Sequence, residues 1–301
     1  MQYFGRKYQL SILTARNTAI TFDPLLKFTF TVVRQIVQLF QYSEITIYNL
    51  DADTETDILK NGVRVALEAG YQDGAYGLIF SGSIVQAIRG KEDATTYYLR
   101  LVVIDGDGPL NLGLASLSTA AGTSVRDLAK LVARSSTIPF DIEVDAGIGE
   151  QKLSRGASYQ GRPGKILRQI AKDNGANFYF DNGKAILAKQ NKPPSGIIPS
   201  LNSQSGLVGF PTQTDQGIKL RMLINPQINL GDWLKLNNKD IIVQQLELGV
   251  PQTILDQDGI YRIIGMTVTG DTRGNDWFQD CECVSQTGSV IGMLSDGSQY
   301  G

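Results

Sequence analysis

The sequence contains no histidine. This absence excludes Ser-His-Asp and Cys-His catalysis, because both need an imidazole to accept the proton of the nucleophile. It also removes the side chain that most often binds a transition metal in proteins. Hydrolysis by two carboxylates needs no histidine, but the spacing of the 30 Asp and Glu residues singles out no such pair. We therefore expect no catalytic residue, no cofactor site and no metal ligand.

Long hydrophobic runs are also absent. The most apolar stretch, FTFTVVRQIVQLF, is interrupted by Arg34, Gln35 and Gln38, and it is shorter than the roughly 18 residues that a membrane-spanning helix needs. The first residues, MQYFGRKYQLSIL, have too short an apolar core for a signal peptide. We expect no membrane partner, and folding in a cytoplasm, where thiols stay reduced.

Charge of one sign is not in excess. The 28 Lys and Arg residues nearly balance the 30 Asp and Glu residues, which gives a formal net charge of −2 and a pI of about 5.3. A protein that binds nucleic acid mainly through its phosphates is expected to be basic. The charge balance therefore argues against a specific nucleic-acid partner.

What is present is the composition of a folded, β-rich protein. The 301 residues, 42% of them hydrophobic, are enough for two or three domains with cores. Residues 1–112 contain six strand-like runs, YQLSIL, LKFTFTVV, SEITIYNL, VRVALEAGY, GLIFSGSIVQAI and TTYYLRLVVIDG. Turn residues such as those of NLDAD, QDGAYG and RGKED separate these runs. This segment is predicted to be an antiparallel, barrel-like β domain.

Residues 113–190 change to a helical period. The run TSVRDLAKLVARS has a capping-box pair, Ser124 and Asp127, and four apolar residues on one helical face: Val125, Leu128, Ala129 and Val132. A second helix is predicted in RPGKILRQIAKDNG, beginning at Pro163 and ending before Gly175. The two helices align at an offset of about 42 residues. With the strand IPFDIEV and the hairpin ANFYF-DNG-KAILAK, they predict a small α/β domain of two similar strand–helix–strand units.

Residues 191–205, rich in Pro, Ser, Asn and Gly, are predicted to be a linker. Residues 206–301 are predicted to be a second barrel-like β domain, with strands in GIKLRMLIN, DWLKLN, DIIVQQLEL, GIYRIIGMTVTG and DWFQDCECV, and with a flexible tail. The predicted fold class is therefore mainly β with a small α/β insertion, two barrel-like β domains flanking a two-helix α/β domain.

The most reactive-looking stretch is GDTRGNDWFQDCECV, residues 270–284, which holds both cysteines. On a strand, alternate residues share a face, so Trp277, Cys281 and Cys283 are predicted to lie together in a core with Gln279 between them. Four other residues are predicted to face the opposite way: Phe278, Asp280, Glu282 and Val284. A disulfide is not expected, because residues two apart on a strand are roughly 6.6 Å apart. Two thiols alone also cannot complete a tetrahedral zinc site.

Other motif-like stretches favour structural interpretations. GASYQGRPGK continues with Arg162 and Pro163 where a phosphate-binding loop has Lys and Ser or Thr, so it predicts a helix start. DGDG, residues 105–108, lacks the later ligands of a calcium loop and predicts a tight turn. Four strand aromatics are predicted to be core residues and not a platform for nucleic-acid bases: Tyr97, Tyr98, Phe178 and Phe180.

The stretch NLDADTETDILKNGVRVALEAGYQDGAYGLIFSGSIVQAIRG resembles the first domain of phage baseplate hub proteins. LRMLINPQINLGDWLKLNN and GIYRIIGMTVTGDTRGNDWFQDCECV resemble the last β domain of this family, and the runs SVRDLA and GKILRQIAKDNGANFYF resemble its small α/β domain. The resemblance covers residues 40–285, and the order of the motifs is its strongest part. The same family includes spike proteins of type VI secretion.

The resemblance implies a homotrimeric hub of a phage tail baseplate, assembled in the host cytoplasm and placed in the virion. In the family, two barrel-like domains per subunit form a pseudo-sixfold ring that meets the tail tube, and the other end meets the central spike. The implied partners are the tail tube and central spike proteins, with tape measure and wedge proteins as further candidates. The family has no catalytic residues to transfer, and spike and lysozyme domains are expected on separate proteins. Residues 202–217 and the C-terminal tail are predicted to be loops that contact baseplate proteins.

Three other interpretations stay open at the level of sequence. One is a tail-associated protein of a non-contractile phage. The second is a carboxylate-based peptidoglycan hydrolase. The third is a carbohydrate-binding β module in residues 196–301.

Overall fold

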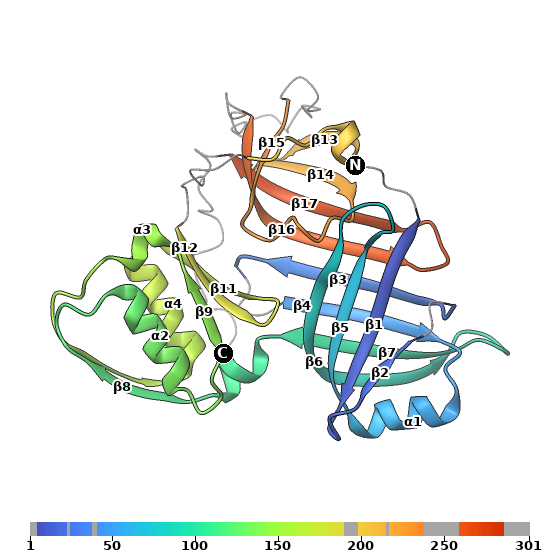
Figure 1. Cartoon of the computed structure of the whole chain (residues 1–301), viewed down its shortest axis with the longest axis horizontal. Helices are drawn as coiled ribbons and strands as arrows, with labels where there is room; N and C mark the ends of the chain where they lie inside the picture. Colours follow the sequence, from blue (N-terminus) through green and yellow to red (C-terminus); the bar gives the residue numbers. More distant parts are fainter. Residues whose placement is uncertain are drawn as a thin grey trace, which may run out of the picture.

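A computed structural model describes residues 5–22, 25–37, 41–189, 198–214, 217–237 and 259–285. The described chain is mainly β with few helices. Strands from its beginning and its end form one twelve-stranded sheet, and a smaller α/β domain lies beside this sheet (Figure 1). No helix in this part of the chain has the length and apolar character to cross a membrane.

The first β segment contributes seven strands to the sheet: β1 (Arg6–Thr14), β2 (Ala19–Thr21), β3 (Phe28–Gln35), β4 (Gln41–Tyr48), β5 (Gly62–Tyr71), β6 (Tyr76–Lys91) and β7 (Tyr97–Asp105). Buried and half-buried residues alternate along β3 and β4 without a break. This period of two is what a strand with one covered face requires. The buried side chains include Phe28, Phe30 and Ile45.

The second β segment contributes β13 (Leu207–Thr214), β14 (Gly217–Leu223), β15 (Trp233–Lys235), β16 (Ile260–Asp271) and β17 (Trp277–Ser285). β16 pairs antiparallel with β3, so that Thr267 lies opposite Val33. The two segments therefore share one sheet, whose main path runs from β13 to β2, and one hydrophobic core. The two barrel-like domains expected from the sequence are not confirmed, because the described strands do not close into a barrel.

A helix was not expected in residues 1–112, but α1 (Ala52–Asn61) lies between β4 and β5. Asp51 caps it by accepting a hydrogen bond from the Thr54 backbone N–H at 2.8 Å, and acidic residues occupy its first turn, where the helix dipole favours them. Only Glu55 and Ile58 are buried, so the helix has a weak apolar stripe.

The α/β domain consists of β8 (Ala115–Thr119), α2 (Val125–Ser135), β9 (Asp141–Val144), α3 (Ala146–Gly149), β10 (Ala157–Gly161), α4 (Pro163–Asp173), β11 (Ala176–Asp181) and β12 (Lys184–Lys189). The order strand–helix–strand occurs twice, as β8-α2-β9 and β10-α4-β11. β8 pairs with β10, β12 lies between β9 and β11, and the domain has a hydrophobic core of its own. The domain boundaries expected at residues 112, 190 and 205 stay predictions.

The local signals in this domain are confirmed. The Ser124 hydroxyl caps α2 by accepting from the Asp127 backbone N–H at 3.1 Å, Pro163 is the first residue of α4, and Gly175 just after α4 has a φ of 59°. The Asn182 and Gly183 turn between β11 and β12 also has two positive φ angles, as a two-residue hairpin loop requires.

Three further expectations concern segments between these elements. DGDG bends at Gly106 and leads into a short π-helix, η1 (Gly108–Leu112). The described part of the predicted linker contains a 3₁₀ turn, η2 (Ser203–Ser205), and a buried Leu201. Residues 190–197 and 286–301, which include the first part of the linker and the tail, lie outside the described residues. Residues 238–258, with the expected strand DIIVQQLEL, also lie outside them.

Candidate functional site

Strand β17 contains the side chains that looked most reactive in the sequence, and it uses them as core. Trp277, Cys281 and Cys283 are each at most 3% exposed, and Gln279 between them is also buried, as predicted. Phe278, Asp280 and Glu282 lie half-buried on the other face. Val284 is buried instead of facing outward with them, because both faces are covered where the strand ends.

The surroundings of the two thiols disfavour both nucleophilic attack and metal binding by sulfur. Burial raises the pKa of Cys281 to about 12 and raises the pKa of Cys283 well above its ordinary value. Both cysteines are free, not joined in a disulfide, and they are protonated at neutral pH, whereas a nucleophile or a metal ligand must be a thiolate. Among the described residues, no group of three or more acidic or Cys side chains could hold a metal ion.

The other sequence motifs also have structural roles. The residues of GASYQGRPGK form β10 and the start of α4, with Pro163 as its first helical residue. Phe178 and Phe180 are buried in the core of the α/β domain, as predicted. The prediction was wrong for Tyr97, which is 51% exposed and is covered on one side by the Lys91 ammonium, 4.9 Å from the ring centre.

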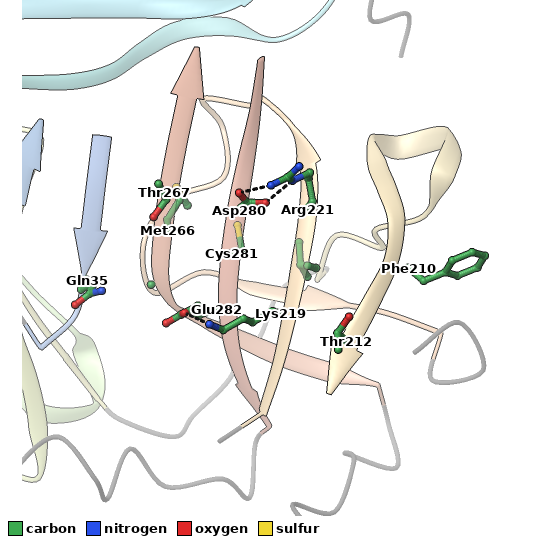
Figure 2. A pocket seen from close by; sticks show the side chains of 12 residues that line it. Gln35, Phe210, Thr212, Lys219, Arg221, Met266, Thr267, Asp280, Cys281 and Glu282 are labelled. Atoms are coloured by element: carbon green, nitrogen blue, oxygen red, sulfur yellow. Dashed lines mark hydrogen bonds and ion pairs between the residues drawn. The ribbon is translucent and has the colours of Figure 1, made fainter. Parts of the chain in front are cut away.

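The outer face of the second β segment carries a ladder of ion pairs around a hollow of about 400 Å³. Arg221 on β14 donates two hydrogen bonds to Asp280 on β17, at 2.7 and 3.0 Å. One pleat along, Lys219 lies 2.8 Å from Glu282. Figure 2 shows these pairs facing each other across adjacent strands. All four side chains are more than 40% exposed, and the two ion pairs together add no net charge to this face.

Phe210, at the edge of the same face, is one of the residues that line the hollow, and its ring points away from the neighbouring strands (Figure 2). Its side chain is 68% exposed. It stands in β13, where the pairing with β14 shifts register between Val208 and Thr212 and Gly209 has a φ of 70°. This bulge, together with Pro211, interrupts the backbone edge that another strand would need for pairing. The loop expected over residues 202–217 is instead a short 3₁₀ turn at 203–205 and the strand β13 at 207–214, and residues 215–216 lie outside the described residues.

A second concentration of polar groups lies where the α/β domain meets the sheet. Arg34 on β3 forms a buried ion pair with Asp181 at the end of β11, and their side chains are 3% and 6% exposed. Gln41 bridges the two parts as well, because its amide donates to the Phe180 carbonyl at 2.8 Å while its oxygen accepts from the Gln35 backbone N–H at 2.7 Å. All six residues of β11 are buried, so the β11–β12 hairpin joins the two cores.

Asp105, at the end of β7, belongs to this junction. Its carboxylate accepts a hydrogen bond from the Gly183 backbone N–H at 2.9 Å. The pKa of Asp105 is raised to about 7, mainly by burial and also by the nearby Asp181 carboxylate, although the Gly183 hydrogen bond and the charges of Arg64 and Arg34 lower it. The junction therefore contains a carboxyl group whose protonation changes near neutral pH.

Sequence reasoning did not find the junction or the exposed Phe210. The junction joins residues that are 147 positions apart in the chain, and no local pattern signals such a pair. Phe210 lies in LVGFPTQT, where Gly and Pro suggested a loop. The sequence signal that could have pointed to Phe210 was an aromatic residue directly before a proline in a polar segment.

Comparisons with known proteins found one matching family and a group of solved structures with a similar fold. A family model described as baseplate hub gp41 matches residues 34–241 of the chain. No curated protein matches the sequence significantly. The fold, however, has many relatives among solved structures.

Three of these structures are similar along most of the chain. The 43 kDa tail protein of prophage MuSo2 from Shewanella oneidensis has a TM-score of 0.60 at 9% identity, covering 93% of this chain and 99% of its own. A tail protein from Neisseria meningitidis MC58 has a TM-score of 0.58 at 9% identity, with coverages of 94% and 97%. The Escherichia coli c3393 protein is described as a type VI secretion component similar to the T4 tail proteins gp27 and gp5. Its TM-score is 0.56 at 9% identity, covering 87% of this chain and 75% of its own.

Proposed function

This chain belongs to the baseplate hub gp41 family, and we propose that three copies of it form a ring that joins the tail tube of a phage to its central spike. Membership in this family makes the chain a component of a phage tail. What we propose beyond this membership is the ring, its threefold symmetry, and its contacts with the tail tube and the central spike. The observation that carries it is the similarity of fold to phage tail proteins along nearly the whole chain, not in one module.

The architecture supports this arrangement. Each chain has two β segments, which are joined edge to edge through β3 and β16. Three such chains supply six β segments, which is the number needed to meet a sixfold tube, while the ring itself keeps threefold symmetry toward a spike. Because both segments share one core, each subunit would act as a rigid double unit of the ring.

A structural role fits the described residues better than catalysis does. The buried thiols are protonated, and the exposed carboxylates on the outer face are paired with Arg221 and Lys219. We propose that the tail tube and central spike proteins bind the hub, with tape measure and wedge proteins as outer partners.

Mass measurement of the purified full chain at micromolar concentrations tests the ring. We expect a trimer, or a monomer that becomes a trimer when the central spike protein of the same phage is added. A chain that stays monomeric under both conditions contradicts the proposal. A matched sample in high salt is the control, because a ring held mainly by apolar contacts should persist there.

A further inference from the structure

The positive charge of the chain is concentrated in the α/β domain. Residues 115–189 contain 11 Lys and Arg against seven Asp and Glu, which gives this domain a net charge of +4, whereas the whole chain has a net charge of −2. Charge of one sign gathered on one part of a protein selects partners of the opposite sign. The asymmetry therefore indicates an anionic partner for the α/β domain.

Part of this charge forms a basic face on the two longer helices of the domain. Helices α2 and α4 pack side by side (Figure 1). The exposed Lys165, Arg168 and Lys172 recur at positions i, i+3 and i+7, so they lie on one side of α4. Lys130 is exposed on α2, and Leu131 after it is 43% exposed. These five residues are the basic face.

The four cations of the basic face have no ion-pair partner within the described residues. The acidic side chains of the two helices are otherwise engaged. Asp127 accepts from the Ser124 hydroxyl at 2.7 Å, and Asp173 accepts from the Gln169 amide at 2.7 Å. An anionic surface placed on the face therefore gains attraction without displacing an ion pair.

A hollow at the other end of the chain has the opposite charge. Figure 1 shows α1 and the β6–β7 hairpin at the end of the sheet away from the α/β domain. The Asn49 backbone N–H donates to the Tyr97 carbonyl at 2.9 Å, and the Asn49 side-chain oxygen accepts from the Tyr97 N–H at 3.0 Å. These bonds hold the hairpin beside the start of α1, and a hollow of about 780 Å³ lies between the two.

Four exposed carboxylates at the rim of this hollow are the acidic end: Asp51, Asp53, Glu92 and Asp93. They are sequence neighbours of Ala52 and Lys91, which line the hollow, and none of them has an ion-pair partner in the described part of the chain. Of the two cations in the lining, Arg89 is paired with Glu55, and Lys91 lies over the Tyr97 ring, 4.9 Å from its centre. The rim is therefore net negative and suits ammonium and guanidinium groups.

We propose that the basic face of one subunit binds the acidic end of the next subunit in the ring. This inference rests on the proposed trimer. A cyclic ring of three needs two different, complementary patches on every chain, because a single self-complementary patch gives only dimers. The basic face and the acidic end are two such patches, at separate places on one chain (Figure 1). Both lie within residues 41–189, which the structure describes without a gap.

Charge and apolar area have different roles in this contact. Exposed opposite charges set orientation and partner choice more than affinity, and salt screens them. Apolar side chains supply affinity: Leu131 on the basic face, and Tyr97 and Ile88, 51% and 37% exposed, on the β6–β7 hairpin. The natural contact should therefore persist in high salt, whereas like charges facing each other should prevent it at low salt.

Nucleic acid is the competing occupant of the basic face. Proteins that bind a phosphate backbone combine many cations, often with aromatic side chains for stacking. The basic face has four cations and no aromatic residue, and the carboxylates of Asp127 and Asp173 lie on the same two helices. A protein surface with a few carboxylates fits this face better, and the acidic end provides four.

Charge reversal on each patch tests the contact. Lys165→Glu with Arg168→Glu reverses the basic face, and Asp53→Lys with Glu92→Lys reverses the acidic end. A combined variant carries all four substitutions, so that its patches are complementary again with the signs exchanged. Asp51 and Asp93 are left unchanged, because Asp51 caps α1 and Asp93 accepts hydrogen bonds within its turn.

Lys152→Glu with Arg155→Glu is the matched control. It reverses two exposed cations of the same domain that lie outside α2 and α4. The assembled fraction of each variant is measured by mass over a range of protein concentrations, with and without the central spike protein of the same phage.

Each variant with one reversed patch should raise the concentration at which half of the chains are assembled by about tenfold or more, because like charges then face each other. The combined variant should return to the concentration of the unmodified protein, and the control should not depart from it. In about 1 M salt, where the screening length is roughly 3 Å, the variants with one reversed patch should approach the unmodified protein, which misfolded chains would not do.

If both variants with one reversed patch form trimers as readily as the unmodified protein, the contact is wrong while the ring stands. A combined variant that assembles no better than those two, or an equal loss in the control, also overturns the contact. A basic-face variant that assembles normally but loses binding to a short DNA duplex would assign the face to nucleic acid instead. Unmodified protein that stays monomeric with and without the spike overturns both the ring and this inference.

Discussion

At the scale of single residues, Trp277 contributes to the sheet through ring contacts. Its ring lies 5.6 Å from that of Phe30 and 5.9 Å from that of Tyr8, and the Arg6 guanidinium lies over it at 5.3 Å. Its Nε1 has no hydrogen-bond partner within the described residues. The stabilisation therefore comes from the apolar ring, not from the indole N–H.

Trp277→Ala should lower the free energy of unfolding by about 3–5 kcal/mol, because it removes a buried aromatic ring and leaves a cavity. Denaturant unfolding measures the change. Trp277→Phe is the matched control: it keeps a ring and removes only an unpaired N–H, so its loss should be clearly smaller. Equal losses would mean that the indole nitrogen has a role that these contacts do not account for.

Asp105 gives the fold a pH dependence with a defined sign. Burial raises its pKa to about 7 from an ordinary value of 3.8. Between these values the folded chain keeps a proton that the unfolded chain has lost. The contribution of Asp105 to stability is therefore complete below about pH 4 and is lost as the pH rises to about 7.

Asp105→Asn stays neutral at every pH and should remove this loss. We expect the free energy of unfolding of the variant, relative to the unmodified protein, to rise between pH 4 and pH 8 by about 1.4 kcal/mol for each unit of raised pKa. Unfolding by urea at the two pH values measures it. Asp107→Asn, on a half-buried neighbour, is measured beside it as the control for removing a carboxylate at this turn. A difference that is independent of pH would contradict the raised pKa.

At the scale of elements, the β11–β12 hairpin joins the α/β domain to the sheet. Its buried Asp181 pairs with Arg34, and the Tyr179 hydroxyl donates to the Leu230 carbonyl at 3.2 Å. Tyr179 belongs to the core of the sheet while Phe178 and Phe180 belong to the core of the α/β domain. Alternate residues of one strand thus pack into two cores.

Arg34→Met leaves the Asp181 carboxylate buried without its partner and should cost about 3–5 kcal/mol of unfolding free energy. The double variant Arg34→Met with Asp181→Leu removes both charges and should recover most of that loss, because an apolar pair needs no compensation. A double-mutant cycle in denaturant measures the coupling. If the double variant is as unstable as the single one, the junction depends on shape and not on charge pairing.

The elements differ in how well the sequence predicts them. Strands β3 and β4 alternate strictly, and β17 alternates up to Cys283. Helices α2 and α4 have clear start signals and apolar faces, so local physics specifies these elements. Helix α1 buries only Glu55 and Ile58, and its helical period is therefore too weak to predict it. The pairing of β3 with β16 joins strands more than 200 residues apart, and only tertiary packing decides it.

At the scale of the whole molecule, the two β segments form one sheet and not two separate domains. Arg6 on β1 donates to the carbonyls of Asp271 and Gly274, at 3.0 and 2.6 Å, and Arg273 donates to the Leu25 carbonyl at 2.6 Å. These contacts tie the first segment to the β16–β17 hairpin beyond the strand pairing itself. A subunit built in this way transmits force as one body, which suits a proposed ring between a tube and a spike.

The proposed structural role also predicts what the whole protein does not do. We expect no clearing of a peptidoglycan suspension and no stoichiometric metal on elemental analysis. General-base and nucleophilic chemistry near neutral pH relies on His, or on Cys or Lys with a perturbed pKa. This chain has no His, and the pKa of both its thiols is raised by burial. Turbidity of the suspension, with lysozyme as the active control, and metal analysis of the purified chain measure the two properties. Clearing that an Asp or Glu substitution abolishes, or zinc or calcium bound one to one, would overturn the structural role.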